Sequence, residues 1–326
     1  MGALAPLLDD AAITEIMVNG PGPVWIEREG ALQRTDLVLD LHTIESLVER
    51  LLAQSGRRVD RRVPYADARL ADGSRVNVVI PPVAIDGPCF TVRRFASAPR
   101  SLDAFAPAAT ASLLRWLVEA RANIVVTGAA GAGKTTLLNA LTGAISPGER
   151  VVTIEDAAEL RLQSEHVVRL EARPPNSEGA GGVTSRVLLR NALRMRPDRL
   201  VVGEVRGHEA VEMLQAMSTG HDGSLSTCHG NGPLDALRRI EIMVLLADPA
   251  LDAHAVREQL ASAIDAVVHV ARRADGSRGV TEVVELSPQL PLDARPIVRE
   301  GRVVALPERV RAKAAAGAPD TGWLAA

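Results

Sequence analysis

The sequence predicts an α/β protein with two domains, a smaller α+β domain at the N-terminus and a larger domain built on a largely parallel sheet. Its 326 residues, 47% hydrophobic and 24% charged, suffice for two domains that each bury a core. Short alternating runs broken by Gly and Pro fill the first part of the chain, whereas after Ser112 continuous aliphatic runs alternate with helical stretches. The small, polar, Pro-containing segment 96–101 separates the two patterns.

These patterns set the expected domain limits. The N-terminal domain should occupy residues 1–95, and a linker should follow at 96–111. The larger domain, with helices at its C-terminal end, should occupy 112–311. The Ala-rich stretch 312–326 lacks periodicity, so we expect a flexible tail there.

The first domain should contain a strand pair, one helix, a hairpin and a further strand. Alternating apolar residues on both sides of a Gly/Pro turn predict each pair of strands. Apolar residues spaced three and four apart predict the helix, which Asp40 or Thr43 could cap. In chain order, these elements are expected at 14–19 and 24–28, 44–52, 68–70 and 75–80, and 89–95.

The second domain should contain buried strands at 124–127, 151–154 and 200–202, separated by helical stretches. Strands that are apolar on both faces and alternate with helices are typical of a parallel sheet covered on both sides.

Composition excludes several classes of protein. Aromatic residues make up only 2% of the chain, which argues against a platform that stacks nucleic-acid bases. The net charge of −3 creates no global attraction for nucleic acid or anionic lipid, which leaves a local basic patch as the alternative. Two cysteines and an N-terminus without a basic flank or long apolar run fit a cytoplasmic protein, and no run of about 18 apolar residues spans a membrane.

A phosphate-binding loop is the strongest motif. The segment Gly128–Thr135 matches the full pattern and follows an expected strand and precedes an expected helix at 137–141. Lys134 should reach the β- and γ-phosphates of a nucleoside triphosphate, and the Thr135 hydroxyl should hold Mg²⁺. Of 37 basic residues only Lys134 and Lys313 are lysines, and Lys313 has no expected role. The expected nucleotide-binding residues are Gly128, Ala129, Ala130, Gly131, Ala132, Gly133, Lys134, Thr135 and Thr136.

Acidic residues follow two of the expected strands. Glu204 lies in Leu200–Arg206, where an acid can orient water beside the γ-phosphate, although Gly203 stands where an Asp is usual. The alternative is a surface acid at a strand end. In the segment 153–160 we prefer Glu159 as the functional acid, the alternative being that Asp156 or Glu159 caps a helix.

Two histidines, His221 and His229, flank a short expected strand between Gly-containing loops. Zinc is excluded as an interpretation because its sites need closer ligand pairs and a further Cys or His at short range. The arrangement fits a sensor that detects the γ-phosphate or relays its loss, and the alternative is a pair of structural histidines.

Together these motifs resemble the ATPases of type II and type IV secretion systems, most closely the CpaF/TadA type that powers tight-adherence (Flp) pilus assembly. The specific segments are Ile154–Asp156, Gly203–Arg206 and Gly220–Ser224, which that family calls the Asp box, an atypical Walker B motif and the His box. Residues 14–20 and 72–78 look like the family's N-terminal domain.

The resemblance implies a RecA-like P-loop NTPase domain preceded by the α+β domain, and ATP and Mg²⁺ as cofactors. It implies a ring, usually a hexamer, peripheral at the inner face of the cell membrane, where it works with a membrane platform protein. ATP would lie between the two domains. Glu204 would orient the attacking water, Glu159 would assist at the metal, and His221 and His229 would communicate nucleotide state. The arginines that match the family's γ-phosphate contacts are Arg75, Arg93 and Arg94.

Two other functions stay open at this stage. A motor for DNA transfer has the same architecture, and five arginines support it, although a solvated face or a subunit contact is their default interpretation: Arg186, Arg190, Arg194, Arg196 and Arg199. The net charge and the scarcity of aromatics favour a pilus or secretion motor over this one. A nucleotide-binding module without catalysis would show no ATP turnover.

Overall fold

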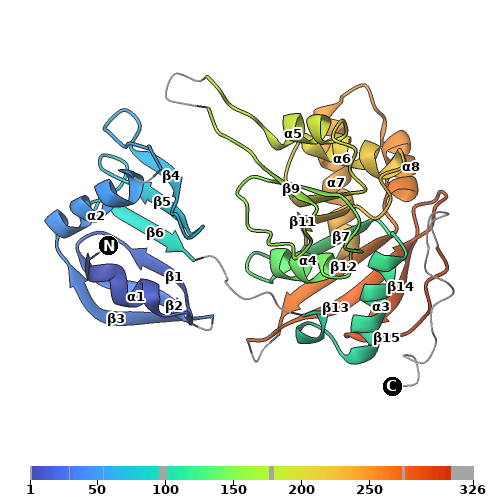
Figure 1. Ribbon diagram of the computed structural model, residues 1–326, viewed down its shortest axis with the longest axis horizontal. Helices are drawn as coiled ribbons and strands as arrows, with labels where there is room; N and C mark the ends of the chain where they lie inside the picture. The colour runs from blue at the N-terminus through green and yellow to red at the C-terminus, as the bar shows by residue number, and fades with distance from the viewer. Residues whose placement is uncertain are drawn as a thin grey trace. The chain divides into compact units, whose positions relative to one another are not determined.

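The computed structural model describes residues 2–28, 30–53, 55–94, 101–175, 180–273 and 276–309. The chain divides into two compact units, Met1–Ala98 and Pro99–Ala326 (Figure 1). Within the expected linker, positions 96–100 lie outside the described residues, and the rest contains a short 3-10 helix, η2 (Leu102–Ala104), and the first turn of helix α3. The expected tail at 312–326 also lies outside the described residues.

The first unit is an antiparallel sheet of six strands covered by a helix. Its strand order is β3-β2-β1-β6-β5-β4, and every neighbouring pair is antiparallel. In chain order its elements are η1 (Gly2–Leu4), α1 (Ala5–Asp9), β1 (Ile13–Val18), β2 (Gly22–Arg28), β3 (Ala31–Leu39), α2 (Leu41–Ala53), β4 (Tyr65–Arg69), β5 (Arg75–Val79) and β6 (Cys89–Arg93).

The expected strand pair, helix, hairpin and final strand of this unit are all confirmed. The Asp40 carboxylate accepts a hydrogen bond of 2.8 Å from the Thr43 backbone N–H, so Asp40 caps α2. The apolar face of α2, including Ile44 and Leu51, packs into one core with the sheet. Strand β3 was not expected, because most of its side chains are exposed and give no apolar alternation.

The second unit has a nine-stranded sheet in the order β15-β14-β13-β12-β7-β11-β10-β8-β9. The six strands from β12 to β9 in that order are parallel, and β13, β14 and β15 add to one side antiparallel. Its elements after η2 are α3 (Ala108–Glu119), β7 (Ile124–Gly128), α4 (Lys134–Thr142), β8 (Val151–Glu155), β9 (Val167–Glu171), α5 (Ser185–Ala192), β10 (Arg199–Val205), α6 (Glu209–Ser218), β11 (Leu225–His229), α7 (Pro233–Ala247), α8 (Ala253–Ala263), β12 (Ala266–Arg272), β13 (Arg278–Leu286), β14 (Ala294–Arg299) and β15 (Arg302–Val303).

Helices cover both faces of this sheet, as expected for buried parallel strands (Figure 1). Side chains alternate along β7, so Ile124 and Val126 join the core with α3 and α4, whereas Val125 joins the core with α5 to α8. The parallel strands begin at one edge of the sheet, here called the amino edge, and end at the other, the carboxyl edge. Their C-terminal residues therefore meet: Gly128 of β7 pairs with His229 of β11.

The C-terminal part of this unit differs from the expected set of helices. It contains α7 and α8, but the four strands β12 to β15 follow them. Among the described residues, no helix combines the length and the apolar character needed to span a membrane.

Candidate nucleotide-binding and catalytic site

The phosphate loop connects β7 to α4 at the carboxyl edge, as expected. Gly131 and Gly133 have φ angles of +71° and +99°, a left-handed region that other residues adopt only with strain. A Cβ on Gly128 would lie 2.3 Å from the Val270 carbonyl oxygen, so this position has no room for a side chain. The glycines of the motif are therefore required by backbone conformation and close packing.

Lys134 begins helix α4, and its side chain curls over the loop. Its Nζ donates hydrogen bonds of 3.1 Å and 3.0 Å to the carbonyl oxygens of Gly128 and Ala129, and the residue is only 7% exposed. Thr135 and Thr136 follow in the first turn of α4, where backbone N–H groups and the helix dipole favour an anion. This cradle has the composition and the placement of a triphosphate site.

Glu204 lies near the end of β10, two strands from the phosphate loop in the sheet order. One carboxylate oxygen contacts the His229 Nδ1 atom, and the other contacts the Arg206 guanidinium. Burial raises the pKa of Glu204, but the contacts with Arg206 and His229 outweigh it, so the net pKa lies below its ordinary value. Glu204 is therefore a partly buried anion held from two sides.

The neighbouring strand explains why Gly203 stands where an Asp is usual. A Cβ on Gly203 would lie 2.9 Å from the Cγ of Glu155, so the missing side chain leaves room for the Glu155 carboxyl group. The Glu155 Oε1 atom accepts hydrogen bonds of 2.8 Å and 2.9 Å from the backbone N–H groups of Glu159 and Leu160. Burial raises the pKa of Glu155. Through these hydrogen bonds, Glu155 holds the backbone of the segment that follows β8.

The other acids of the Asp box lie nearer the surface. Asp156 accepts a hydrogen bond of 2.7 Å from the Ser185 hydroxyl. The charges of Asp156 and Glu159 both act on Arg206, which puts them beside the Glu204 cluster. The interpretation as a helix cap is wrong, because the described residues 156–166 form no helix.

The two histidines are not brought together. His229 reaches Glu204, but His221 lies in the turn before β11, at the amino edge. Leu225, at the start of β11, pairs with Ile124 at the start of β7. At roughly 3.3 Å per residue, β11 alone separates the two histidines by about 13 Å. Within one chain, His221 therefore does not join the Glu204 cluster as a sensor.

Cys228 precedes His229 but offers no reactive thiolate. The side chain is fully buried, and burial raises its pKa to about 11. A thiol with this pKa stays protonated at neutral pH, whereas zinc binds thiolates.

The turn that carries His221 is tied to a buried polar network. Arg199 is 1% exposed and forms a two-pronged ion pair with Glu149 at 2.7 Å and 3.0 Å. The same guanidinium donates to the carbonyl oxygen of Gly223, whose N–H in turn donates to the Asn123 side chain. This network fixes the start of β11 and has a structural character.

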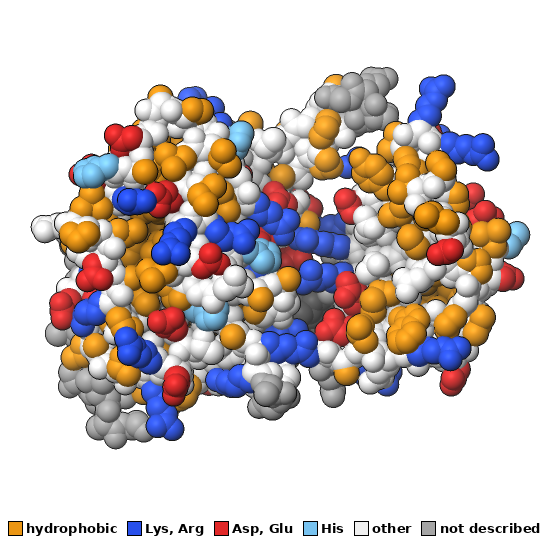
Figure 2. Space-filling model, turned by 180° about the vertical axis from the view of Figure 1, so that it is seen from behind, with side chains coloured by type: hydrophobic (Ala, Val, Ile, Leu, Met, Phe, Trp, Pro, Cys, Tyr) orange, Lys and Arg blue, Asp and Glu red, His pale blue; other side chains and the backbone are white. Residues whose placement is uncertain are grey.

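Three of the five arginines that supported a DNA motor form ion pairs with carboxylates. Arg199 is buried, and Arg186 and Arg190 both contact the Glu212 carboxylate at 2.7–2.8 Å. Glu212 itself is 3% exposed. In Figure 2, basic side chains lie among acidic ones over the face of the larger unit that is shown.

The arginines expected at the γ-phosphate belong to the first unit. Arg75 and Arg93 pair directly across β5 and β6, and Arg69 of β4 pairs with Arg75 on the other side. Residues opposite each other in a sheet share a face, so these three form a basic row. Arg94 instead donates to the backbone carbonyl oxygens of Asp10 and Ile13, which gives it a structural role inside its unit.

Sequence reasoning missed Glu155, Arg206 and Arg69. The pattern Gly203-Glu204, with Gly where an acid is usual, was the available signal for Glu155. Arg206 was quoted within its motif but given no role, and Arg69 precedes the hairpin turn that was recognised.

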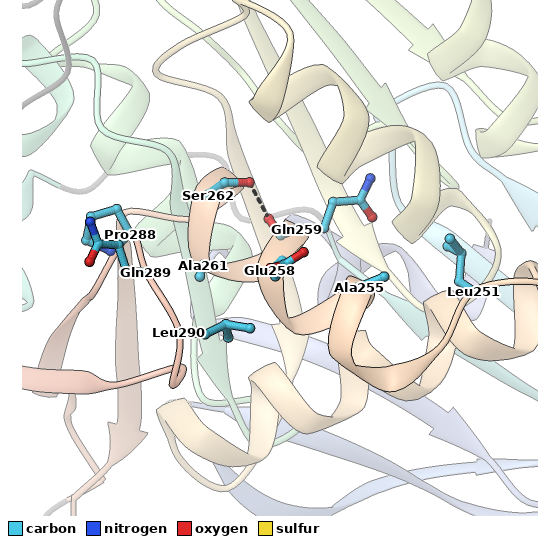
Figure 3. A pocket seen from close by; sticks show the side chains of 9 residues that line it. All are labelled: Leu251, Ala255, Glu258, Gln259, Ala261, Ser262, Pro288, Gln289 and Leu290. Atoms are coloured by element: carbon cyan, nitrogen blue, oxygen red, sulfur yellow. Dashed lines mark hydrogen bonds between the residues drawn. The ribbon is translucent and has the colours of Figure 1, made fainter.

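A hollow of about 610 Å³ lies elsewhere in the larger unit (Figure 3). It is lined by one face of α8 and by the loop after β13, with Leu251 at one end and Pro288 and Gln289 at the other. Ile264, which follows α8, leads directly into β12, whose first residue Ala266 pairs with the start of β7, so the end of α8 lies at the amino edge. The hollow thus lies away from the phosphate loop.

Comparisons with known proteins agree with this arrangement. Residues 1–301 match the family model described as type II/IV secretion system protein. A putative conjugal transfer protein of Mycobacterium tuberculosis is 42% identical over 297 residues, covering 87% of this chain and 84% of the relative. The type IV secretion system protein PtlH of Bordetella pertussis is 37% identical over 306 residues, covering 83% of this chain and 89% of the relative.

Among solved structures, the pilus retraction motor PilT with bound ADP has a TM-score of 0.61 and 20% identity, covering 89% of this chain and 80% of that one. At this identity the likeness shows the fold, an N-terminal domain followed by a RecA-like domain. The family match, the relatives' identity and the complete phosphate loop lead to one conclusion: the chain belongs to the type II/IV secretion system family and is an ATPase.

Proposed function

We propose that this ATPase is the motor of a tight-adherence type pilus-assembly or secretion system. It would act as a homo-hexameric ring in the cytoplasm, at the inner face of the cell membrane, against a membrane platform protein. The observation that carries the ATP-driven part of the proposal is the contact of Glu204 with His229 at the same sheet edge as the phosphate loop. That edge is where ligands bind in open α/β sheets.

In the proposed chemistry, the loop 128–133 and Lys134 hold the triphosphate. Glu204 orients the attacking water, and its contacts with Arg206 and His229 offset the effect of burial on its pKa, so it is ionised at neutral pH. His229 touches Glu204 and is the residue that relays nucleotide state to β11. The structure supports no equivalent contact for His221.

Residues at the carboxyl edge of the sheet carry the oxygen atoms that a magnesium ion needs. Mg²⁺ prefers oxygen ligands, which the Thr135 hydroxyl and the Glu159 carboxylate supply. The second carboxylate oxygen of Glu155 is buried and has no hydrogen-bond partner among the described residues, which adds an oxygen acceptor to this corner. When bound, the ion would neutralise charge on the phosphates.

The basic row of the first unit supports its proposed role at the γ-phosphate. Arg69, Arg75 and Arg93 lie in one row across β4, β5 and β6, and Glu15 of β1 pairs with Arg93 at one end of that row. Guanidinium groups suit phosphate oxygens because they donate in a planar fork. We propose Arg75 and Arg93 as the contacts and add Arg69 to them.

A protein partner is supported by the apolar surface of the first unit. Most of the exposed large hydrophobic side chains among the described residues belong to it, and Figure 2 shows hydrophobic side chains gathered on its face. They are Trp25, Leu32, Val38, Leu41, Val63, Tyr65, Val83 and Ile85.

A motor for conjugative DNA transfer is the second candidate. The name of the Mycobacterium tuberculosis relative favours it, whereas the ion-paired arginines of the larger unit disfavour direct contact with DNA. The pilus motor and the DNA-transfer motor can thus be distinguished by whether DNA stimulates the ATPase.

The test uses the purified full chain and, in parallel, the cell. DNA-stimulated phosphate release that falls steeply with salt would favour DNA transfer, and its absence would set a DNA motor aside. In the cell, a chromosomal Lys134→Ala variant should abolish pili without changing conjugation frequency. Loss of conjugation with pili intact would overturn the pilus proposal. Neighbouring pilin and platform genes would support it independently.

A further inference from the structure

Arg206 has no role in the chemistry described so far, although it touches the central acid. Its Nη2 atom contacts Glu204 Oε2, while His229 Nδ1 contacts Glu204 Oε1. Each of the two carboxylate oxygens is thereby held by a different side chain. A carboxylate held at both oxygens has one orientation rather than several.

The backbone explains why Arg206 can reach back to Glu204. Side chains two residues apart in an extended segment share a face, and Val205 between them is buried. The backbone N–H groups of Arg206 and Gly207 donate to the Glu209 carboxylate at 2.6 Å and 2.9 Å, which fixes the start of α6. Because these hydrogen bonds hold the Arg206 backbone in place, its guanidinium reaches Glu204 from a fixed position.

The charges of several acidic residues also act on Arg206. Its contact with Glu204 raises its pKa, and the nearby charges of Asp156 and Glu159 add to that effect. Glu204 contacts the guanidinium directly, and Asp156 and Glu159 act on it through their charge alone. Without this cation, the acids of the Walker B and Asp box motifs would repel one another.

We propose that Arg206 is a positioning residue for Glu204, which fixes the Glu204 carboxylate in the orientation that keeps one oxygen on His229. The inference rests on the role proposed for Glu204 in orienting water. It assigns no contact between Arg206 and the nucleotide. Arg206 acts through Glu204, so its loss should slow the chemical step and leave ATP binding intact.

The arrangement also separates positioning from folding. The Arg206 side chain is 58% exposed, and ion pairs at that exposure contribute little to stability. A matched control is Arg257, which is 53% exposed and pairs with Glu241 at 3.0 Å between α8 and α7. Both substitutions to Ala remove one exposed Arg–Glu pair, but only one of these pairs includes Glu204.

The test measures kcat and KM for ATP in the full chain and in four variants: Arg206→Ala, Arg206→Lys, Glu204→Gln and Arg257→Ala. Because displacement of a catalytic group by about 1 Å can cost about 100-fold, we expect Arg206→Ala to lower kcat about 10- to 100-fold. KM should stay within about two-fold of the unaltered protein, as for an interaction made in the chemical step. Arg206→Lys should recover at least about three-fold in kcat, since an ammonium group still supplies the charge. Arg257→Ala should change neither constant.

Three outcomes overturn an assignment. If Glu204→Gln loses activity but Arg206→Ala keeps the kcat of the unaltered protein, Arg206 does not position Glu204, and the role of Glu204 stands. If Arg206→Ala raises KM with kcat unchanged, Arg206 is a nucleotide contact instead. If Glu204→Gln itself keeps full activity, the proposed function of Glu204 fails, and this inference fails with it.

Discussion

Replacing Arg199 by Ala should destabilise the larger unit strongly. Such a loss is expected of a structural arginine and not of an arginine on a DNA-binding surface. The Arg199 guanidinium makes two hydrogen bonds to Glu149, at 2.7 Å and 3.0 Å, and donates at 2.9 Å and 3.2 Å to the carbonyl oxygens of Val118 and Gly223. Its removal leaves Glu149 with Arg121, which lies 2.7 Å away, as its remaining ion-pair partner among the described residues. Two buried carbonyl oxygens lose a donor as well.

The magnitude follows from this loss. Removing one member of a buried ion pair costs about 3–5 kcal/mol. For a unit of about 150–250 residues, each kcal/mol shifts the melting temperature by roughly 2–4 °C. We therefore expect Arg199→Ala to lower Tm by about 6–20 °C. The exposed Arg257–Glu241 pair should contribute only about 0–1 kcal/mol.

The effect should depend on pH. Burial raises the pKa of Glu149, but the Arg199 contacts and the Arg121 charge outweigh it, so the net pKa lies below its ordinary value of 4.5. A group with a lowered pKa in the folded state stabilises above its ordinary pKa, and that stabilisation is lost as pH falls through the lowered value. The difference in Tm between the unaltered protein and Arg199→Ala should therefore be full near pH 7 and shrink below pH 4.5.

Calorimetry of the unaltered protein, Arg199→Ala, Arg199→Lys and Arg257→Ala checks this reasoning. Arg199→Lys should fall between the first two, because an ammonium group cannot reproduce the two-pronged contact. A Tm for Arg199→Ala within about 2 °C of the unaltered protein, which corresponds to less than about 1 kcal/mol, would refute the buried network.

Three further predictions concern the site. Lys134→Ala should weaken ATP binding at least about 30-fold by calorimetric titration, because a charge-assisted contact in a buried site is lost. The control Lys313→Ala should bind ATP normally, and equal affinities of the two variants would contradict the assignment of the phosphate loop. Gly128→Ala should lose ATP binding, because its Cβ would lie 2.3 Å from the Val270 carbonyl oxygen. Gly148→Ala, whose Cβ would have no neighbour within 4 Å, is the control, and normal ATP binding by Gly128→Ala would refute the packing argument. At pH 8 a maleimide should label Cys89 but not Cys228, whose pKa is about 11, until the protein is denatured; rapid native labelling of Cys228 would show that it is not buried.

Local patterns carried much of the fold. The apolar stripe of α2, the hairpin turn before Arg75 and the aliphatic runs of β7, β8 and β10 each depend on neighbouring residues in the chain, so the sequence predicts them directly. The phosphate loop is equally local, since its glycines and Lys134 all lie in the short segment 128–134.

Contacts between distant segments could not be predicted in the same way. Glu155 fills the space left by Gly203, and Arg199 reaches Glu149 and Gly223, but none of these pairs is close in sequence. Strands β12 to β15 follow α7 and α8, whereas only helices were expected at the C-terminal end of this domain. His221 and His229 were paired by their spacing, but a strand between two residues carries them to opposite edges of a sheet.

The most direct test of the central claim is phosphate release by the unaltered protein and by Glu204→Gln with Mg²⁺-ATP, with ATP binding measured on the same samples. Glu204 should matter to turnover and not to affinity, because it lies on β10 and the phosphate loop follows β7. We expect Glu204→Gln to bind ATP normally and release phosphate at least about 100-fold more slowly, as for loss of a single group that acts in the transition state. Equal and appreciable rates in the two proteins would contradict the account.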